Sequence, residues 1–93
     1  MTIQKRWSKP SKAKNAPEKS GVYEFGNSQG TVLKIGEGDN LKERIMKQVP
    51  SKPKDVTRIR WLPARNAEKL EKQMLEEFKE KHGRLPKYNE RIG

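Results

Sequence analysis

Residues 21–36 decide the fold, and they read Gly-Val-Tyr-Glu-Phe-Gly-Asn-Ser-Gln-Gly-Thr-Val-Leu-Lys-Ile-Gly. Residues 22–25 and 31–35 are rich in aromatic and β-branched side chains, which favour strands. The loop between them has glycine at both ends, and a short glycine-bounded loop is the sequence signal of a β-hairpin. Hairpin pairing is expected to bring Tyr23 into the neighbourhood of Lys34.

The residues after the hairpin predict a helix, a strand and a second helix. The first helix is expected to follow its N-cap Asp39 and to end at Pro50, because apolar residues recur there on one face. Residues 56–62 alternate apolar and basic side chains, which is typical of a strand with one buried face. The second helix is expected to run from its cap Asn66 to Gly83. Its apolar stripe comprises Ala67, Leu70, Met74, Leu75 and Phe78. The predicted fold class is α+β, with a small three-stranded mixed or antiparallel sheet in the order β-β-α-β-α.

The chain is strongly basic, and its charge is concentrated near the N-terminus. Its 93 residues include 22 Lys and Arg against 12 Asp and Glu, for a net charge of +10. Residues 1–19 lack apolar periodicity, so we expect a basic, mostly disordered arm in which Trp7 could dock onto a domain spanning residues 20–93. The candidate phosphate contacts are Lys5, Arg6, Lys9, Lys12, Lys14 and the strand residues Arg58 and Arg60. The alternative is that the arm and the basic strand face are simply solvated.

Composition also excludes several kinds of site. The chain has no cysteine and one histidine, His82, so thiolate metal sites, cysteine nucleophiles and multi-histidine metal sites are ruled out. No apolar run is long enough for a signal peptide or a transmembrane helix, and we expect a cytoplasmic protein without a membrane partner. The charge excess favours a nucleic acid partner. An interaction protein whose arm binds an acidic protein or an anionic membrane surface is a further alternative.

The tripeptides Gly21-Val22-Tyr23 and Lys34-Ile35-Gly36 are followed along the chain by Arg44, Glu71 and Asn89. In this order and spacing, these residues resemble the pattern of the GIY-YIG nuclease domains. That family is named for a Gly-Ile-Tyr and a Tyr-Ile-Gly tripeptide about ten residues apart on its first two strands, and residues 21–23 and 34–36 stand in those places. Its signature also includes an Arg on the first helix, a Glu on a later helix and an Asn near the end. Those places correspond to Arg44, Glu71 and Asn89. The likeness spans residues 21–90.

The resemblance implies a metal-dependent endonuclease that hydrolyses DNA phosphodiester bonds. Glu71 would hold Mg²⁺ or Mn²⁺, with Glu68 as its competitor on nearly the same helix face. Tyr23 would take a proton from the attacking water, and Arg44 would bind the scissile phosphate. Asn89 would organise the site through side-chain hydrogen bonds.

Lys34 departs from the family pattern, because it replaces the second tyrosine with a flexible cation. It could contact phosphate, or it could mark a domain that has lost catalysis and kept binding. A catalytically inactive nucleic-acid-binding module on the same fold is therefore the alternative function. Lys47 and Gln48 are both candidates for the polar residue that the family carries after its Arg. The sequence leaves open the oligomeric state and whether a partner protein supplies specificity.

Overall fold

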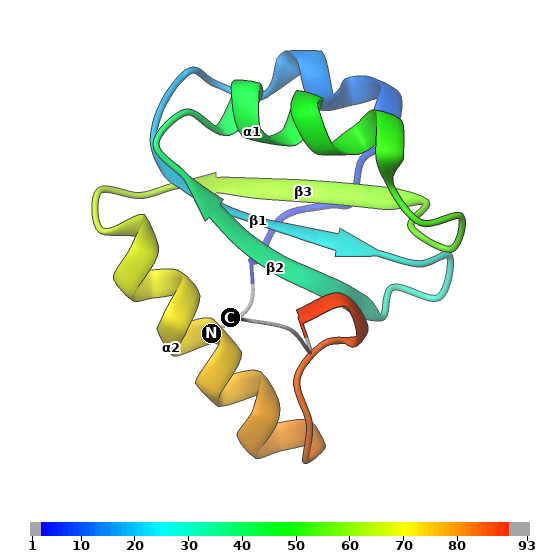
Figure 1. Ribbon diagram of the computed structural model, residues 1–93, viewed down its shortest axis with the longest axis vertical. Coiled ribbons are helices and arrows are strands. Elements are labelled where there is room, and N and C mark those ends of the chain that lie inside the picture. The colour runs from blue at the N-terminus through cyan, green and yellow to red at the C-terminus, as the bar shows by residue number, and fades with distance from the viewer. Residues whose placement is uncertain (1–2, 90–93) are drawn as a thin grey trace.

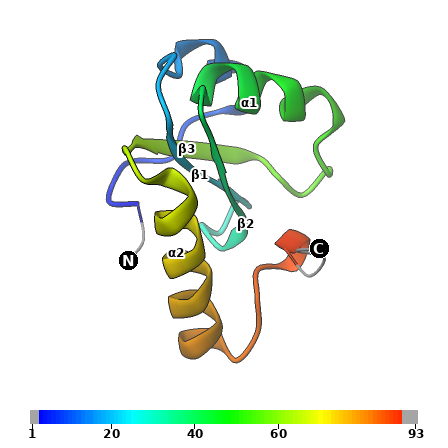
Figure 2. The same ribbon diagram turned by 60° about the vertical axis from the view of Figure 1, so that its left-hand side comes forward.

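The computed structural model describes residues 3–89, which form a three-stranded antiparallel sheet with one α-helix on each face (Figures 1 and 2). The strands are β1 (Gly21–Gly26), β2 (Val32–Gly38) and β3 (Arg58–Pro63), in the spatial order β2-β1-β3. The α-helices are α1 (Leu41–Gln48) and α2 (Ala67–His82), and the short 3-10 helices are η1 (Pro10–Asn15), η2 (Val49–Ser51) and η3 (Lys87–Asn89). The predicted α+β class and the β-β-α-β-α order are confirmed.

The central strand β1 divides the core into two parts, because alternate side chains of a strand point to opposite faces. Tyr23 and Phe25 pack beneath α1 with Leu41 and Ile45, whereas Val22 packs beneath α2 with Met74. All six residues of β1 are buried. None of the helices formed by residues 3–89 is long and apolar enough to cross a membrane.

The helix boundaries follow the sequence signals with one correction. The N-cap of α1 is Asn40, whose side-chain oxygen accepts a hydrogen bond from the Glu43 backbone N–H at 3.0 Å, and the prediction of Asp39 was wrong. Strand β2 continues to Gly38 and moves the cap one residue along the chain. At the end of α2, Gly83 adopts a left-handed φ of 76°, as predicted for a glycine at this position.

The N-terminal segment is ordered over residues 3–19, and the prediction of a mostly disordered arm is corrected there. Ile3 is 1% exposed in the core beneath α2. Ser8 pairs with Ile59 through two backbone hydrogen bonds of 2.8 Å, so the segment covers the open edge of β3. Farther along, Ala13 joins the core beneath α1. Composition alone could not show this docking, because it depends on a few apolar contacts and on backbone pairing.

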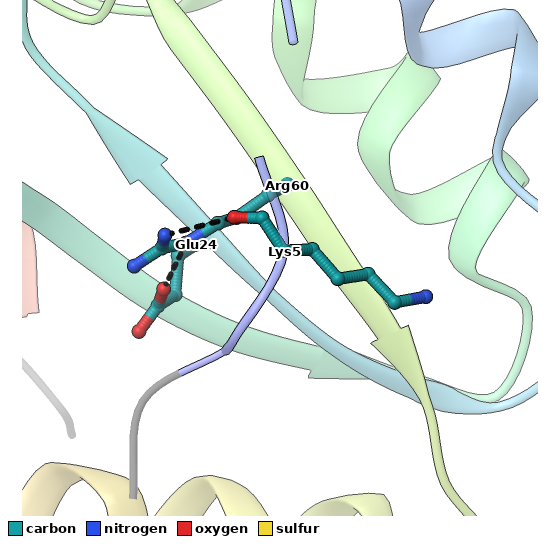
Figure 3. A network of polar contacts seen from close by, with 3 residues as sticks. All are labelled: Lys5, Glu24 and Arg60. Atoms are coloured by element: carbon teal, nitrogen blue, oxygen red, sulfur yellow. Dashed lines mark hydrogen bonds and ion pairs between the residues drawn. The ribbon is translucent and has the colours of Figure 1, made fainter. Parts of the chain in front are cut away.

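Trp7 docks as the sequence suggested, beside an ion pair between Arg60 and Glu24. Figure 3 shows this ion pair. A side chain on Gly26 would overlap the Trp7 ring, so glycine is what allows this close approach. The Arg60 guanidinium lies 3.9 Å from the centroid of the same ring. Arg60 also donates to the fully buried Glu24 carboxylate at 2.6 Å and to the Lys5 carbonyl at 3.1 Å. Burial raises the pKa of Glu24, and the ion pair with Arg60 opposes that rise.

We expect Trp7→Ala to lower the free energy of unfolding by about 2 kcal/mol, because it removes apolar burial and a cation–π contact. Chemical denaturation followed by far-UV circular dichroism measures this change. The matched control is Arg6→Ala, whose exposed side chain should change stability by less than about 0.5 kcal/mol. Equal stability of the two variants would mean that the segment does not hold the fold together.

Candidate functional site

The hairpin register brings Tyr23 and Lys34 onto one face of the sheet, as the tripeptide spacing predicted. Tyr23 pairs with Gly36, and Phe25 pairs with Lys34. A side chain on Gly36 would overlap the Tyr23 ring near its hydroxyl. The absence of that side chain lets the phenol ring lie across β2, which is an edge strand. The Tyr23 ring is therefore buried against β2, and its hydroxyl lies next to Gly36.

Gln48, at the end of α1, joins Lys34 to Tyr23. Lys34 Nζ donates to Gln48 Oε1 at 2.9 Å, and Gln48 Nε2 donates to Tyr23 Oη at 2.6 Å. Of the two candidates for the polar residue after Arg44, Gln48 contacts the candidate site, whereas Lys47 is exposed. The sequence did contain a signal for Gln48, because it follows Arg44 by one helical turn and so shares its face of α1.

Arg44 extends over the β2 edge from α1. Its side chain packs against Gly38, where an added Cβ would meet Arg44 Cβ at 3.0 Å. Burial, followed by the positive charge of Arg44, lowers the pKa of Lys34. Burial raises the pKa of Tyr23, and a hydrogen bond from Gln48 and the charge and side-chain hydrogen bond of Arg44 oppose that rise. The cationic groups and the phenol therefore share one small region.

Glu71 reaches the same region from α2. Its pKa is raised by burial and by the carboxylate of Glu37, and lowered by the positive charges of Arg44 and Lys34. Glu68 is exposed, whereas Glu71 is half-buried, so the structure favours Glu71 over its competitor. Sequence analysis did not single out Glu37, which lies between two glycines at the end of β2.

Asn89 fixes the outer edge of β2. Its side-chain oxygen accepts from the Ile35 backbone N–H, and its side-chain nitrogen donates to the Ile35 carbonyl, both at 2.8 Å. The segment that carries Asn89 is anchored by Tyr88, whose hydroxyl donates to Asp55 at 2.6 Å, and by Lys87, which donates to the same carboxylate at 2.9 Å. Asn89 therefore pins the residue between Lys34 and Gly36, in the middle of the tripeptide.

We call the group formed by Tyr23, Lys34, Arg44, Gln48 and Glu71 the β2 site. It combines one half-buried carboxylate with two cations and a phenol. Residues 3–89 contain no cluster of three or more His, Asp or Glu side chains that could enclose a metal. Sparse ligation by one carboxylate, with the rest supplied by water and phosphate oxygens, is the way Mg²⁺ is usually held. The donor set thus fits Mg²⁺ and does not fit a zinc site.

The predicted phosphate contacts lie elsewhere and divide into two groups. Lys5, Arg6, Lys9, Lys12 and Lys14 are all exposed. Arg58 and Arg60 belong to β3, at the opposite sheet edge from β2. Arg60 is engaged with Glu24 and Trp7, and its side chain is only 14% exposed, so it is less available for a phosphate contact than the exposed cations of the N-terminal segment.

Solved structures with the same fold define the class of this domain. The chain aligns with the GIY-YIG N-terminal endonuclease domain of UvrC from Thermotoga maritima bound to its catalytic divalent cation, magnesium, with a TM-score of 0.61 and 24% identity, over 85% of this chain and 92% of that chain. A point mutant of the same domain, also bound to its catalytic divalent cation, aligns with a TM-score of 0.61 and 22% identity, over 84% of this chain and 90% of that chain. The chain therefore has the GIY-YIG fold, and the resemblance drawn from its sequence is confirmed at that level.

Sequence comparison places the chain in a particular family. The family described as Domain of unknown function (DUF7508) matches residues 1–81, and the chain belongs to it. UvrABC system protein C of Bacteroides thetaiotaomicron is 48% identical over 31 residues, which are 33% of this chain and 5% of that protein. The protein of the same name from Carboxydothermus hydrogenoformans is 37% identical over 59 residues, which are 61% of this chain and 10% of that protein. The chain thus spans a tenth or less of the curated relatives that it matches.

Proposed function

We propose that this domain hydrolyses phosphodiester bonds of DNA with the help of a divalent cation, Mg²⁺ or Mn²⁺. The observation that carries the proposal is that Glu71, Arg44 and Lys34 are electrostatic neighbours beside the edge strand β2, with Tyr23 buried next to them. Arg44 and Glu71 act on the pKa of both Tyr23 and Lys34, and Arg44 and Lys34 act on the pKa of Glu71. The fold supports the proposal, because the GIY-YIG domain of UvrC is an endonuclease domain with a catalytic divalent cation.

Glu71 is the residue we propose to hold the cation. Its carboxylate is half-buried beside Glu37, and an added cation would relieve the repulsion between the two carboxylates. When bound, such a cation neutralises charge on the phosphate and lowers the pKa of a bound water. Glu71 would also compete with the phosphate for Arg44 and Lys34, and so keep these cations near the β2 edge before DNA arrives.

Arg44 and Lys34 are proposed to hold the scissile phosphate. Arg44 is exposed and offers a rigid fork of donors, which matches two phosphate oxygens. Lys34 is half-buried, and its ammonium group donates a hydrogen bond to Gln48, which holds the ammonium group in one position. Asn89 would act indirectly, because its two hydrogen bonds position the strand that carries Lys34.

The exposed cations of the N-terminal segment are proposed to supply non-specific affinity. Lys5, Arg6, Lys9, Lys12 and Lys14 are exposed on the docked segment, so each can approach the phosphate backbone without breaking a contact of the fold. Binding that depends on such contacts falls steeply as salt rises, because releasing counterions from DNA gains less entropy when the bulk salt concentration is higher.

A nucleic-acid-binding module without catalysis is the second candidate. Two observations favour it. Lys34 stands where the family has a tyrosine. Burial raises the pKa of Tyr23, so less of it is in the phenolate form that could act as a base at neutral pH. Such a module would bind DNA with the same salt dependence and would leave it intact.

Cleavage of labelled single-stranded, duplex and branched DNA distinguishes the two functions. We expect the wild-type chain to cut at least one of these substrates in Mg²⁺ or Mn²⁺, and to stop when EDTA removes the metal. Binding of the same DNAs is measured in parallel at several salt concentrations. Binding that weakens with salt, without cleavage in either metal, would contradict the nuclease and support the module. Absence of DNA binding would contradict both.

A further inference from the structure

The hydrogen bonds around Tyr23 have a fixed direction, which follows from the chemistry of Lys34. A lysine ammonium can only donate, so the Gln48 atom that faces Lys34 must be the amide oxygen. The amide nitrogen, which can only donate, must then face Tyr23. The Tyr23 oxygen therefore accepts from Gln48, and this assignment does not depend on locating any hydrogen atom.

No residue from 3 to 89 accepts a hydrogen bond from the Tyr23 hydroxyl. Arg44, whose charge also acts on the phenol, carries only donors and could not accept the proton. Tyr23 is buried, and a buried phenol that accepts from Gln48 and keeps its own proton can donate that proton to a ligand oxygen that enters the β2 site.

We propose that Tyr23 acts at the β2 site as a hydrogen-bond donor to an oxygen of the bound phosphodiester, and that Gln48 is the positioning residue that holds it in this role. The inference rests on the proposed function, since it takes a phosphodiester as the ligand. It replaces the role that the resemblance implied for Tyr23, which was to take a proton from the attacking water. It also gives Lys34 a second task, because Lys34 determines which way the Gln48 amide faces.

The charges that face the hydroxyl agree with a donor. Lys34 on β2 and Arg44 on α1 are positive and would attract an anionic phosphate to the β2 site, and the charge of Arg44 also acts on the Tyr23 hydroxyl. Glu71 on α2 opposes formation of a phenolate, as does burial of the ring. The Tyr23 pKa is raised, so the phenol keeps its proton through neutral pH and remains able to donate.

Two substitutions at Gln48 have opposite consequences under the two roles. In Gln48→Glu the carboxylate can only accept, so the direction of the hydrogen bond reverses. The Tyr23 hydroxyl then donates to the new carboxylate and is no longer available to the phosphate. Gln48→Met removes the bridge without accepting the proton. If Tyr23 is a donor, Gln48→Glu should cut slower than Gln48→Met, with losses of about 100-fold and about 10-fold respectively. If Tyr23 is a base, the carboxylate would strengthen it, and Gln48→Glu should cut at least as fast as Gln48→Met.

The experiment measures single-turnover cleavage of a labelled DNA at saturating protein, so that weaker binding does not enter the comparison. Gln29→Glu, which adds the same charge in the exposed hairpin loop, is the matched control and should match the wild type. The second readout is the cleavage rate of the wild type divided by that of Tyr23→Phe, measured from about pH 6 to about pH 9. A hydrogen-bond donor should leave this ratio constant. A general base should make it rise about tenfold per pH unit. The proposal is overturned if the ratio of the wild-type rate to the Tyr23→Phe rate rises with pH, or if Gln48→Glu cleaves faster than Gln48→Met.

The donor role of Tyr23 can also be tested if the wild-type chain does not cleave DNA. If the wild type binds DNA without cutting it, the donor role still predicts that Tyr23→Phe and Gln48→Glu each weaken metal-free binding of a labelled duplex. The expected weakening is about threefold to tenfold, measured by fluorescence anisotropy. Unchanged affinity in Tyr23→Phe would refute the donor role, and the loss of cleavage alone would refute only the proposed nuclease.

Discussion

Replacing Glu71 with glutamine is expected to reduce metal-dependent DNA cleavage by at least about 100-fold. Glutamine keeps the size and the side-chain oxygen of Glu71 and loses the negative charge that would hold a divalent cation. Glu71 is the half-buried carboxylate that lies within electrostatic reach of both Arg44 and Lys34. The measurement is the initial rate of cleavage of the substrate that the wild type prefers, in Mg²⁺ and in Mn²⁺.

The same substitution should not unfold the chain, and the sign of the pKa shift shows why. The pKa of Glu71 is raised in the folded state, mainly by burial. At pH values just above the ordinary pKa of glutamate, the folded chain therefore binds more protons than the unfolded chain. The contribution of Glu71 to stability is therefore lost as pH rises through that window. Glu71→Gln has no such loss, so its stability relative to wild type should be higher near pH 7 than near about pH 4.

Glu68→Gln is the matched control for this prediction. Glu68 lies one helical turn from Glu71 but is exposed, and its loss should leave cleavage within about twofold of the wild type. If Glu68→Gln abolishes cleavage and Glu71→Gln does not, the metal ligand has been assigned to the wrong carboxylate. Cleavage that survives both substitutions would point to a contaminating nuclease.

The second large effect is expected at Asn89, where alanine should lower the free energy of unfolding by about 2 kcal/mol or more. Alanine removes both side-chain hydrogen bonds to Ile35 and leaves a buried backbone N–H and a carbonyl without partners. It also releases the edge of β2, so cleavage should fall together with stability. Chemical denaturation and the cleavage assay measure the two losses on the same preparation.

Two further variants make this prediction specific. Asn89→Asp keeps an acceptor for the Ile35 N–H but places a carboxylate oxygen against the Ile35 carbonyl, so it should be no more stable than Asn89→Ala. Asn66→Ala is the control, because Asn66 is exposed and makes no capping hydrogen bond with its side chain. Its stability should stay within about 0.5 kcal/mol of the wild type. Wild-type stability in Asn89→Ala would mean that η3 does not hold β2.

The elements of the fold were predictable because local chemistry specifies them. The hairpin follows from two β-rich segments around a glycine-bounded loop, and α2 follows from its apolar stripe and from Gly83 at its end. Hairpin pairing predicted that Tyr23 and Lys34 are neighbours, and the observed register adds that they share a face, because Lys34 pairs with Phe25 and Phe25 lies two residues from Tyr23. These are short-range rules, and a single sequence contains what they need.

Contacts between distant segments were not predictable in the same way. The ion pair between Glu24 and Arg60 requires β1 and β3 to be neighbours, and the strand alternation alone allowed Arg60 to face solvent. The docking of Ile3 and Ser8 onto the sheet depends on a core and an edge that exist only after the strands have assembled. The bridge made by Gln48 needs α1 to lie across the hairpin.

The sequence by itself determined the order of the strands and helices, the excess of positive charge and the residue types available for chemistry. Tertiary structure alone decided which of those residues meet: Glu71 rather than Glu68, Gln48 rather than Lys47, and Arg60 inside the fold rather than on its surface. The physical reason is that periodicity and capping act over a few residues, whereas burial, desolvation and hydrogen-bond direction depend on neighbours far along the chain.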